Sequence, residues 1–252
     1  MALRASRTYV AARSGSRRIL EWTGEGLLIG VRRHGETSVI AEAMVLGKGR
    51  YLGLVRGGRS RKQAATLQPG NSVQLVWRAR IEDHLGTFAV ELLQARAAGL
   101  IVDRTRLYAS QLLTEHLRLL PERDPHDRLL METVRLLDSP ADGMALARFE
   151  LLLLEELGFG LDLSSCAVTG SSEDLTHVSP RSGRAVSREA AEPYKDRLLR
   201  LPAFLLGQGP ATPQEVADAF ALTGYFLDMH VWHARQIDPP PMRETLIEIL
   251  TR

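Results

Sequence analysis

The feature that most constrains this chain is a change in hydrophobic period near residue 99. Before that point, short apolar runs alternate with polar residues and end in glycine-containing turns, which is the pattern of β-strands. Beyond it, leucines recur at helical spacing over longer segments. We therefore expect an α+β chain in which the strands come first and the helices follow.

Strands are predicted in the first part over residues 26–31, 38–45, 51–55, 72–80 and 88–94. Five short strands are too few for an immunoglobulin-like sandwich and fit a small barrel, the five-stranded OB-fold. In the fourth run, Trp77 shares a face with Val73 and Leu75. We interpret Trp77 as a core residue, and the alternative is a platform on which a nucleic-acid base stacks.

Helices are predicted in the second part over residues 106–120, 125–137, 141–157, 187–199 and 213–232, with a last short helix that ends at Leu250. Asp124 is the expected cap of the second helix, and Thr212 and Glu215 have the spacing of a capping box before the fifth. Residues 161–185 carry glycine and proline at irregular spacing, which indicates an exposed loop or a degenerate knuckle.

The first twenty residues carry five arginines and no acidic residue. They superficially resemble a mitochondrial presequence, but we interpret them as a disordered basic extension or an overlong gene start. The predicted organisation is then a basic leader at residues 1–20, an OB-fold domain at 21–98 and a helical domain at 99–252.

Charge is distributed unevenly along the chain. Residues 1–100 hold sixteen Lys or Arg against seven Asp or Glu, whereas the remainder holds sixteen against twenty-three. Clustered cations gain free energy on phosphates by releasing counterions, so the first part predicts a polyanion partner. A solvated basic face without a partner is the alternative.

Cysteine content and hydropathy limit the protein class. Cys166 is the only cysteine, which excludes an intramolecular disulfide and a four-cysteine metal site and fits a reducing compartment. No apolar run approaches the roughly 20 residues needed to span a bilayer. We therefore expect a cytoplasmic protein without a membrane partner.

The densest basic segment runs from Arg56 to Lys62 and holds four cations. Neither it nor Gly47-Lys48-Gly49 has the spacing of a nucleotide-binding P-loop, and neither is expected to open a helix. Because other cations lie on neighbouring turns and strands of the same barrel, we predict one shared groove for a polyanion backbone, with a solvated loop as the alternative. The candidate binding residues are Arg32, Arg33, Lys48, Arg50, Arg56, Arg59, Arg61 and Lys62.

No convincing catalytic set is present. Cys166 and His177 are imaginable as a nucleophile and its base, but no oxyanion motif or third member accompanies them. His230 and His233 lie three residues apart on one expected helix, with only Asp228 near enough to complete a metal site. We do not expect an enzyme.

Motifs in both parts of the chain carry a family likeness. The first part contains EWTGEGLLI at residues 21–29, RHGETS at 33–38, and basic glycine turns at 47–50 and 56–59. The second contains Phe149-Glu150, LGFGLDL at 157–163 and VSPRSGRAVS at 178–187. In this order, from about residue 21 to residue 250, the chain resembles the bacterial RecO family of recombination mediators.

This resemblance implies an OB-fold joined to a helical domain, binding to single-stranded and double-stranded DNA, and annealing of complementary strands. It also implies partnership with RecR and with single-stranded-DNA-binding protein, to help load the RecA recombinase in association with the nucleoid. An OB-fold RNA-binding or ribosome-associated module is the alternative, because it would share the basic barrel.

The chain departs from the family pattern at one point. Many members carry a four-cysteine zinc knuckle in the helical domain, whereas here Cys166 keeps the first thiol, Thr169 stands at the second position, and the later pair is absent. Too few soft ligands remain for tetrahedral zinc, so we predict no zinc and no other cofactor.

Metal analysis of protein purified without a histidine tag tests this expectation. We expect zinc far below one ion per chain, because a single thiol cannot complete a tetrahedral site. One tightly held zinc ion per chain would contradict it.

Overall fold

The computed structural model describes residues 20–81 and 84–252. The chain divides into two compact units, Met1–Ser139 and Pro140–Arg252. The domain boundary expected after residue 98 stays a prediction from the sequence. In the structure, the helices between residues 97 and 139 form one compact unit with the barrel. The predicted leader lies outside the described residues except for Leu20.

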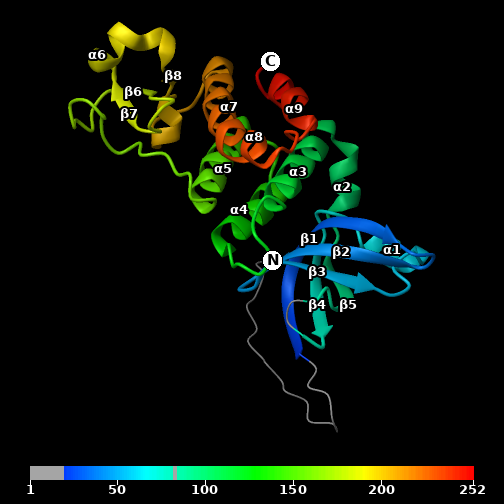
Figure 1. Ribbon diagram of the computed structural model, residues 1–252. Helices are drawn as coiled ribbons and strands as arrows, with labels where there is room; N and C mark the ends of the chain where they lie inside the picture. Colours follow the sequence, from blue (N-terminus) through cyan, green and yellow to red (C-terminus); the bar gives the residue numbers. More distant parts are fainter. Residues whose placement is uncertain (1–19, 82–83) are drawn as a thin grey trace. The chain divides into compact units, whose positions relative to one another are not determined.

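The first unit is built on five strands, β1 (Leu20–His34), β2 (Ser38–Val45), β3 (Gly49–Val55), β4 (Ser72–Ala79) and β5 (Thr87–Gln94). They form a closed barrel in the order β1-β2-β3-β5-β4 (Figure 1). Neighbouring strands are antiparallel except β3 and β5, which meet in parallel at Leu54 and Thr87. The expected α+β fold with an amino-terminal OB-fold barrel is confirmed.

The strand β1 starts earlier than the run predicted at residues 26–31, because its first half pairs with β4 and its second half with β2. Gly26 takes part in both pairings. A Cβ atom at this position would lie 2.7 Å from the carbonyl oxygen of Met44, so only glycine fits where the strand runs close to β2.

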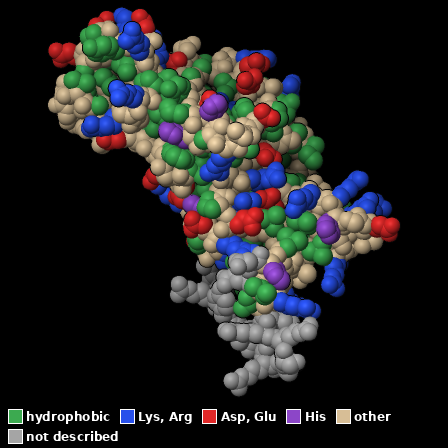
Figure 2. Space-filling view, viewed as in Figure 1, with side chains coloured by type: hydrophobic (Ala, Val, Ile, Leu, Met, Phe, Trp, Pro, Cys, Tyr) green, Lys and Arg blue, Asp and Glu red, His purple; other side chains and the backbone are tan. Residues whose placement is uncertain are grey.

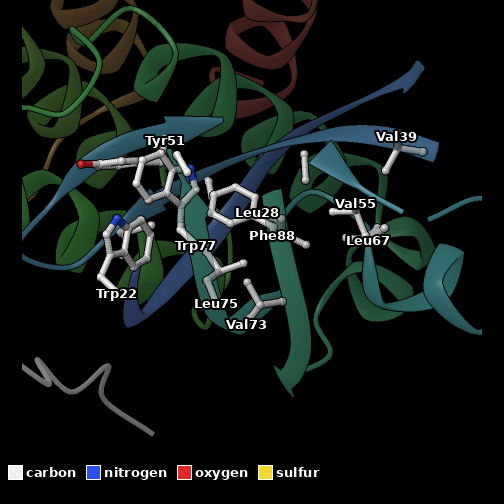
Figure 3. Close-up of a cluster of buried hydrophobic side chains, with 14 residues drawn as sticks. Trp22, Leu28, Val39, Tyr51, Val55, Leu67, Val73, Leu75, Trp77 and Phe88 are labelled. Atoms are coloured by element: carbon white, nitrogen blue, oxygen red, sulfur yellow. The ribbon is translucent and has the colours of Figure 1, made fainter. Parts of the chain in front are cut away.

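Apolar side chains fill the barrel interior. Aromatic rings gather toward one end, contributed by Trp22, Tyr51 and Trp77. The opposite end of the interior is filled by Val39, Val55 and Leu67 (Figure 3). Both ends of the barrel interior are thus packed with side chains.

Trp77 is a core residue. Its side chain stacks on that of Trp22 with ring centroids 5.9 Å apart, and the residue is 1% exposed. The indole N–H donates a hydrogen bond to the carbonyl oxygen of Leu85 at 3.1 Å. The alternative role of Trp77 as a base-stacking platform is therefore wrong.

The described part of the first unit also contains α1 (Arg61–Thr66), α2 (Ala97–Val102), α3 (Arg104–Leu117) and α4 (Asp127–Leu137). The carboxylate of Asp103 caps α3 by accepting hydrogen bonds from its first turn. The helix α4 begins after His126, so the prediction that Asp124 caps it is wrong. The carboxylate of Asp127 accepts a hydrogen bond from the backbone N–H of Gly47 at 2.7 Å, which anchors the start of α4 to the β2–β3 turn.

A buried arginine joins the barrel to α4. Arg96 follows β5, is 5% exposed, and donates from Nε to Oδ1 of Asp138 at 2.6 Å. Its other donors reach the hydroxyl of Ser72 and the amide oxygen of Gln94. The hydrogen bond and the positive charge of Arg96 lower the pKa of Asp138.

The second unit contains α5 (Gly143–Glu156), α7 (Pro213–Leu227) and α9 (Met242–Leu250). The capping box predicted for α7 is present, with Thr212 and Glu215 each accepting a hydrogen bond from the backbone N–H of the other. The helix continues as a π-helix, η3 (Asp228–Trp232), and a final turn, α8 (His233–Arg235).

A buried ion pair holds three helices of this unit together. Glu150 on α5 is fully buried and accepts hydrogen bonds from Nε and Nη2 of Arg243 on α9, both at 2.8 Å. The hydroxyl of Thr223 on α7 donates to the same carboxylate, and Arg243 also donates to the carbonyl oxygen of Phe220. A buried carboxylate requires such compensation.

A small sheet occupies part of the region expected to be an irregular loop. It consists of β6 (Leu175–Val178), β7 (Ala185–Ser187) and β8 (Leu199–Arg200), in the order β7-β6-β8. Strands this short carry too little alternation to be recognised in the sequence. The helix expected at residues 187–199 is split into α6 (Arg188–Ala191) and a 3₁₀ helix, η1 (Glu192–Arg197), because Pro193 lacks the N–H that α-helical bonding needs.

A further 3₁₀ turn, η2 (Ala203–Leu206), precedes α7. Among residues 20–81 and 84–252, no helix combines the length and apolar character needed to cross a membrane.

The pair of Arg96 and Asp138 predicts an acid sensitivity of the first unit. The folded state lowers the pKa of Asp138, so the ionised carboxylate stabilises the fold fully above the ordinary aspartate pKa of about 4. This stabilisation is lost as the pH falls from that value through the lowered pKa of the folded state. Asp138→Asn should lower the free energy of unfolding near pH 7 by about 1–2 kcal/mol and flatten its decline at acid pH. Urea unfolding at several pH values checks this, with Asp238→Asn at an exposed position as the control.

Candidate nucleic-acid interface

Two loops lie side by side at one end of the barrel. The β1–β2 turn and the segment after β3 are joined by a hydrogen bond from the backbone N–H of Arg59 to the carbonyl oxygen of Thr37 at 3.1 Å. The guanidinium of Arg59 donates to the carbonyl oxygens of Gly35, at 3.4 Å, and Glu36. These contacts hold the most basic segment of the chain against the end of β1.

We refer to the exposed cations at this end as the basic end surface, which consists of Arg33, Arg56, Arg59, Arg61 and Lys62. Figure 2 shows Lys and Arg side chains gathered over the end of the barrel that carries α1. These side chains are exposed to solvent and their backbones are held by the barrel, so their charged groups can reach phosphates.

The segment after β3 ends in a helix, contrary to the expectation from sequence. Ser60 caps α1 by accepting a hydrogen bond from the backbone N–H of Gln63. Arg61 and Lys62 occupy the first turn of this helix. The helix was missed because it spans six residues and buries none of them, so no apolar stripe marks it.

Arg32 lies at the same end of β1 as Arg33 but on the opposite face of the strand. It is exposed and neighbours Arg33 on β1, but successive side chains of a strand point to opposite faces. The sequence could not assign a face to either residue, because both are charged.

Lys48 and Arg50 lie at the opposite end of the strands. The β2–β3 turn is separated from the β1–β2 turn by the length of β2, about 23 Å at 3.3 Å per residue. Lys48 stands 5.1 Å from the ring centroid of Trp22, and partial burial lowers its pKa. The single groove predicted to contain all eight candidates is therefore not formed.

Arg50 takes part in an internal ion-pair network. Its guanidinium donates to the carboxylate of Glu42 and, from Nε, to the carbonyl oxygen of Leu120 at 2.9 Å. Glu42 is 7% exposed and also accepts from Nε of Arg118 at 3.0 Å. Arg50 thus balances a buried carboxylate between β2 and α3, which removes it from the set of cations free to meet a phosphate.

A cleft lies beside α1, between that helix and the end of β1. It encloses about 440 Å³. Its lining residues are Val31, Arg33, Val39, Gly58, Arg59, Ala64, Leu67, Gln68 and Pro69. Sequence reasoning did not find this α1 cleft, because its walls come from separate segments that only the closed barrel brings together.

The thiol of Cys166 is held inside the second unit. Its sulfur accepts hydrogen bonds from the backbone N–H groups of Thr169, at 3.5 Å, and Ser187, at 3.3 Å, and from the Ser187 hydroxyl. Burial raises the pKa of this thiol, but these hydrogen bonds outweigh burial and lower the pKa to about 6. Among the residues the structure describes, no group of three or more His, Cys, Asp or Glu side chains is placed to hold a metal ion.

Comparison with known proteins identifies relatives over nearly the whole chain. Residues 19–96 match the family Recombination protein O N terminal, and residues 102–236 match Recombination protein O C terminal. The DNA repair protein RecO of Mesorhizobium japonicum is 53% identical over 239 residues, 92% of this chain and 94% of that protein. The proteins of the same name from Methylobacterium nodulans and Brucella abortus are 53% and 51% identical, again over 92% of this chain.

These matches cover the barrel and the helices in one order, and they include the basic segment after β3 as well as the region around Cys166. The chain belongs to the RecO family of DNA repair proteins.

Proposed function

We propose that this protein binds single-stranded and double-stranded DNA through the basic end surface and anneals complementary strands. The observation that carries the proposal is the gathering of five exposed cations at one end of the barrel, on β1, on the loop after β3 and on α1. Membership of a DNA repair family supports DNA as the polyanion. It also favours DNA over RNA, which the sequence left open.

The surface suits backbone contact and does not suit base stacking. The aromatic residues of the described barrel point inward, where Trp22, Trp77 and Phe88 are each at most 5% exposed. Sequence-independent binding then rests on charge, because each phosphate that a cation neutralises releases condensed counterions. Two complementary strands repel through their phosphates, so a surface that neutralises both lowers the barrier to pairing.

Annealing by charge neutralisation needs no covalent step, and we propose that the protein is not an enzyme. The only thiol, Cys166, is 1% exposed and held by Ser187 and Thr169, which suits a structural role in the loop. A single thiol with Thr169 at the next ligand position does not fit a tetrahedral zinc ion. We therefore also propose that the loop is held by its hydrogen bonds, without zinc or another cofactor.

The partners proposed from the family likeness are RecR and single-stranded-DNA-binding protein. With them, the protein would help to load RecA on coated single strands at the nucleoid. The excess of acidic residues beyond residue 100 favours the second part of the chain for protein contacts, because it repels DNA.

Replacement of Arg59, Arg61 and Lys62 together with alanine tests the basic end surface. The slope of log affinity against log salt concentration should become shallower by about 2 for single strands. Each lost phosphate contact removes about 0.7 from the magnitude of this slope. Strand annealing should slow in parallel. The control replaces three exposed arginines of the second unit, Arg181, Arg197 and Arg200, with the same change in net charge. An unchanged slope in the first variant would remove this surface from the binding site.

Annealing of strands coated with the cognate single-stranded-DNA-binding protein tests the mediator role. We expect the intact protein to anneal coated strands, because contacts to the coat protein bring it to the DNA. A basic peptide with the same number of positive charges should anneal bare strands only. Equal failure of both on coated strands would reject the mediator role and leave simple charge-driven annealing.

A further inference from the structure

The α1 cleft combines an apolar floor with a cationic rim. Its accessible apolar lining comes from Val31, Ala64 and Pro69, which are half-buried or exposed, whereas Val39 and Leu67 on its floor are nearly covered, at 5% and 3% exposed. Arg33 and Arg59 lie on its wall as members of the basic end surface. Its volume of about 440 Å³ falls within the range of roughly 300 to 1,000 Å³ that is typical of small-ligand sites.

The backbone around the cleft is fixed by close packing. A Cβ atom on Gly58 would lie 2.6 Å from Cγ2 of Val39, 3.1 Å from the carbonyl oxygen of Val55 and 3.2 Å from Cδ1 of Leu67. Only glycine lets the loop after β3 pass so close to the floor. The loop therefore cannot shift without breaking this contact, and the recess between it and α1 is a property of the folded barrel.

The position of Arg59 orients charge toward this recess. Its Nη1 donates to the carbonyl oxygens of Gly35 and Glu36, which pins the guanidinium against the β1–β2 turn. A guanidinium has five N–H donors, so others remain for an anionic ligand. Arg33 on β1 pairs across the strand with Val39, which places the second cation directly beside the apolar floor.

An occupant of the cleft must match both features, with an anionic group for the rim and a flat apolar face for the floor. A nucleotide has both, since its base is planar with a weakly polar face and its phosphate is anionic. Bases of a duplex are stacked and paired and would have to be extruded at a cost of a few kcal/mol, whereas bases of a single strand are accessible.

We propose that the α1 cleft receives one unstacked base of single-stranded DNA while Arg33 and Arg59 hold an adjacent phosphate. The inference rests on the proposed DNA binding and adds to it a reason to prefer single strands over duplex. Because the aromatic rings of the described barrel lie in its interior, the cleft offers a base aliphatic contact in place of stacking.

The test compares two single strands of equal length and equal phosphate number, oligothymidylate and a fully abasic strand. The full chain should bind oligothymidylate about tenfold more tightly, because only that strand can fill the cleft. Ala64→Phe fills the cleft from α1 and should reduce this ratio to near one. Ala65→Phe, at the next position, which is also exposed but lies outside the cleft lining, should keep the tenfold ratio.

Equal binding of both strands by the wild-type protein, with salt dependence retained, would overturn the base site and leave charge-driven binding intact. Loss of salt-dependent binding to both strands would overturn the proposed function as well. If a folded Ala64→Phe variant kept the tenfold preference for oligothymidylate over the abasic strand, base recognition would lie elsewhere and the cleft would be rejected as the base site.

Photocrosslinking of wild-type protein with 4-thiothymidine in the strand gives a second measurement that needs no variant. Adducts are expected on Ala64, Leu67, Gln68 or Pro69, which line one side of the cleft. Adducts confined to other peptides would overturn the proposal.

Discussion

Closure of the barrel is the constraint on which the candidate site depends. β1 is hydrogen-bonded along both edges, and β3 meets β5 at Leu54 and Thr87, so the sheet has no free edge between them. The antiparallel order of β1, β2 and β3 brings the turn after β1 against the loop after β3, so cations distant in sequence share one surface although none of them contributes to the core. Closure through the pairing of β1 with β4 then brings residues 67–69, which precede β4, beside β1.

Two groups of arginines have different roles in this chain. Arg96 and Arg243 are buried, and Arg50 is mostly covered; each is paired with a carboxylate because an unpaired charge is costly away from water. Those of the basic end surface are exposed and meet solvent. The positive balance of residues 1–100 therefore overstates the charge available to DNA, since part of it stabilises the junction of the barrel with α3 and α4.

Regular alternation made the strands predictable, and helical spacing made α3, α5 and α7 predictable. The short helix α1 and the strands β6 to β8 carry too few residues for a period to be seen. For the site, the basic segment after β3 was found by composition. The position of Lys48 at the far end follows from the order of antiparallel hairpins and could have been predicted from the sequence. The pairing of Arg50 with Glu42 and the α1 cleft could not, because both depend on three-dimensional packing.

The chemical make-up of the basic end surface limits how a cell could regulate it. Four of its five cations are arginines, and Lys62 is the only amine among them. Acetylation neutralises lysine and leaves the guanidinium of arginine unchanged. An acetyltransferase could thus erase a single charge at this end of the barrel, so lysine modification would change the proposed affinity of this surface for phosphates only slightly.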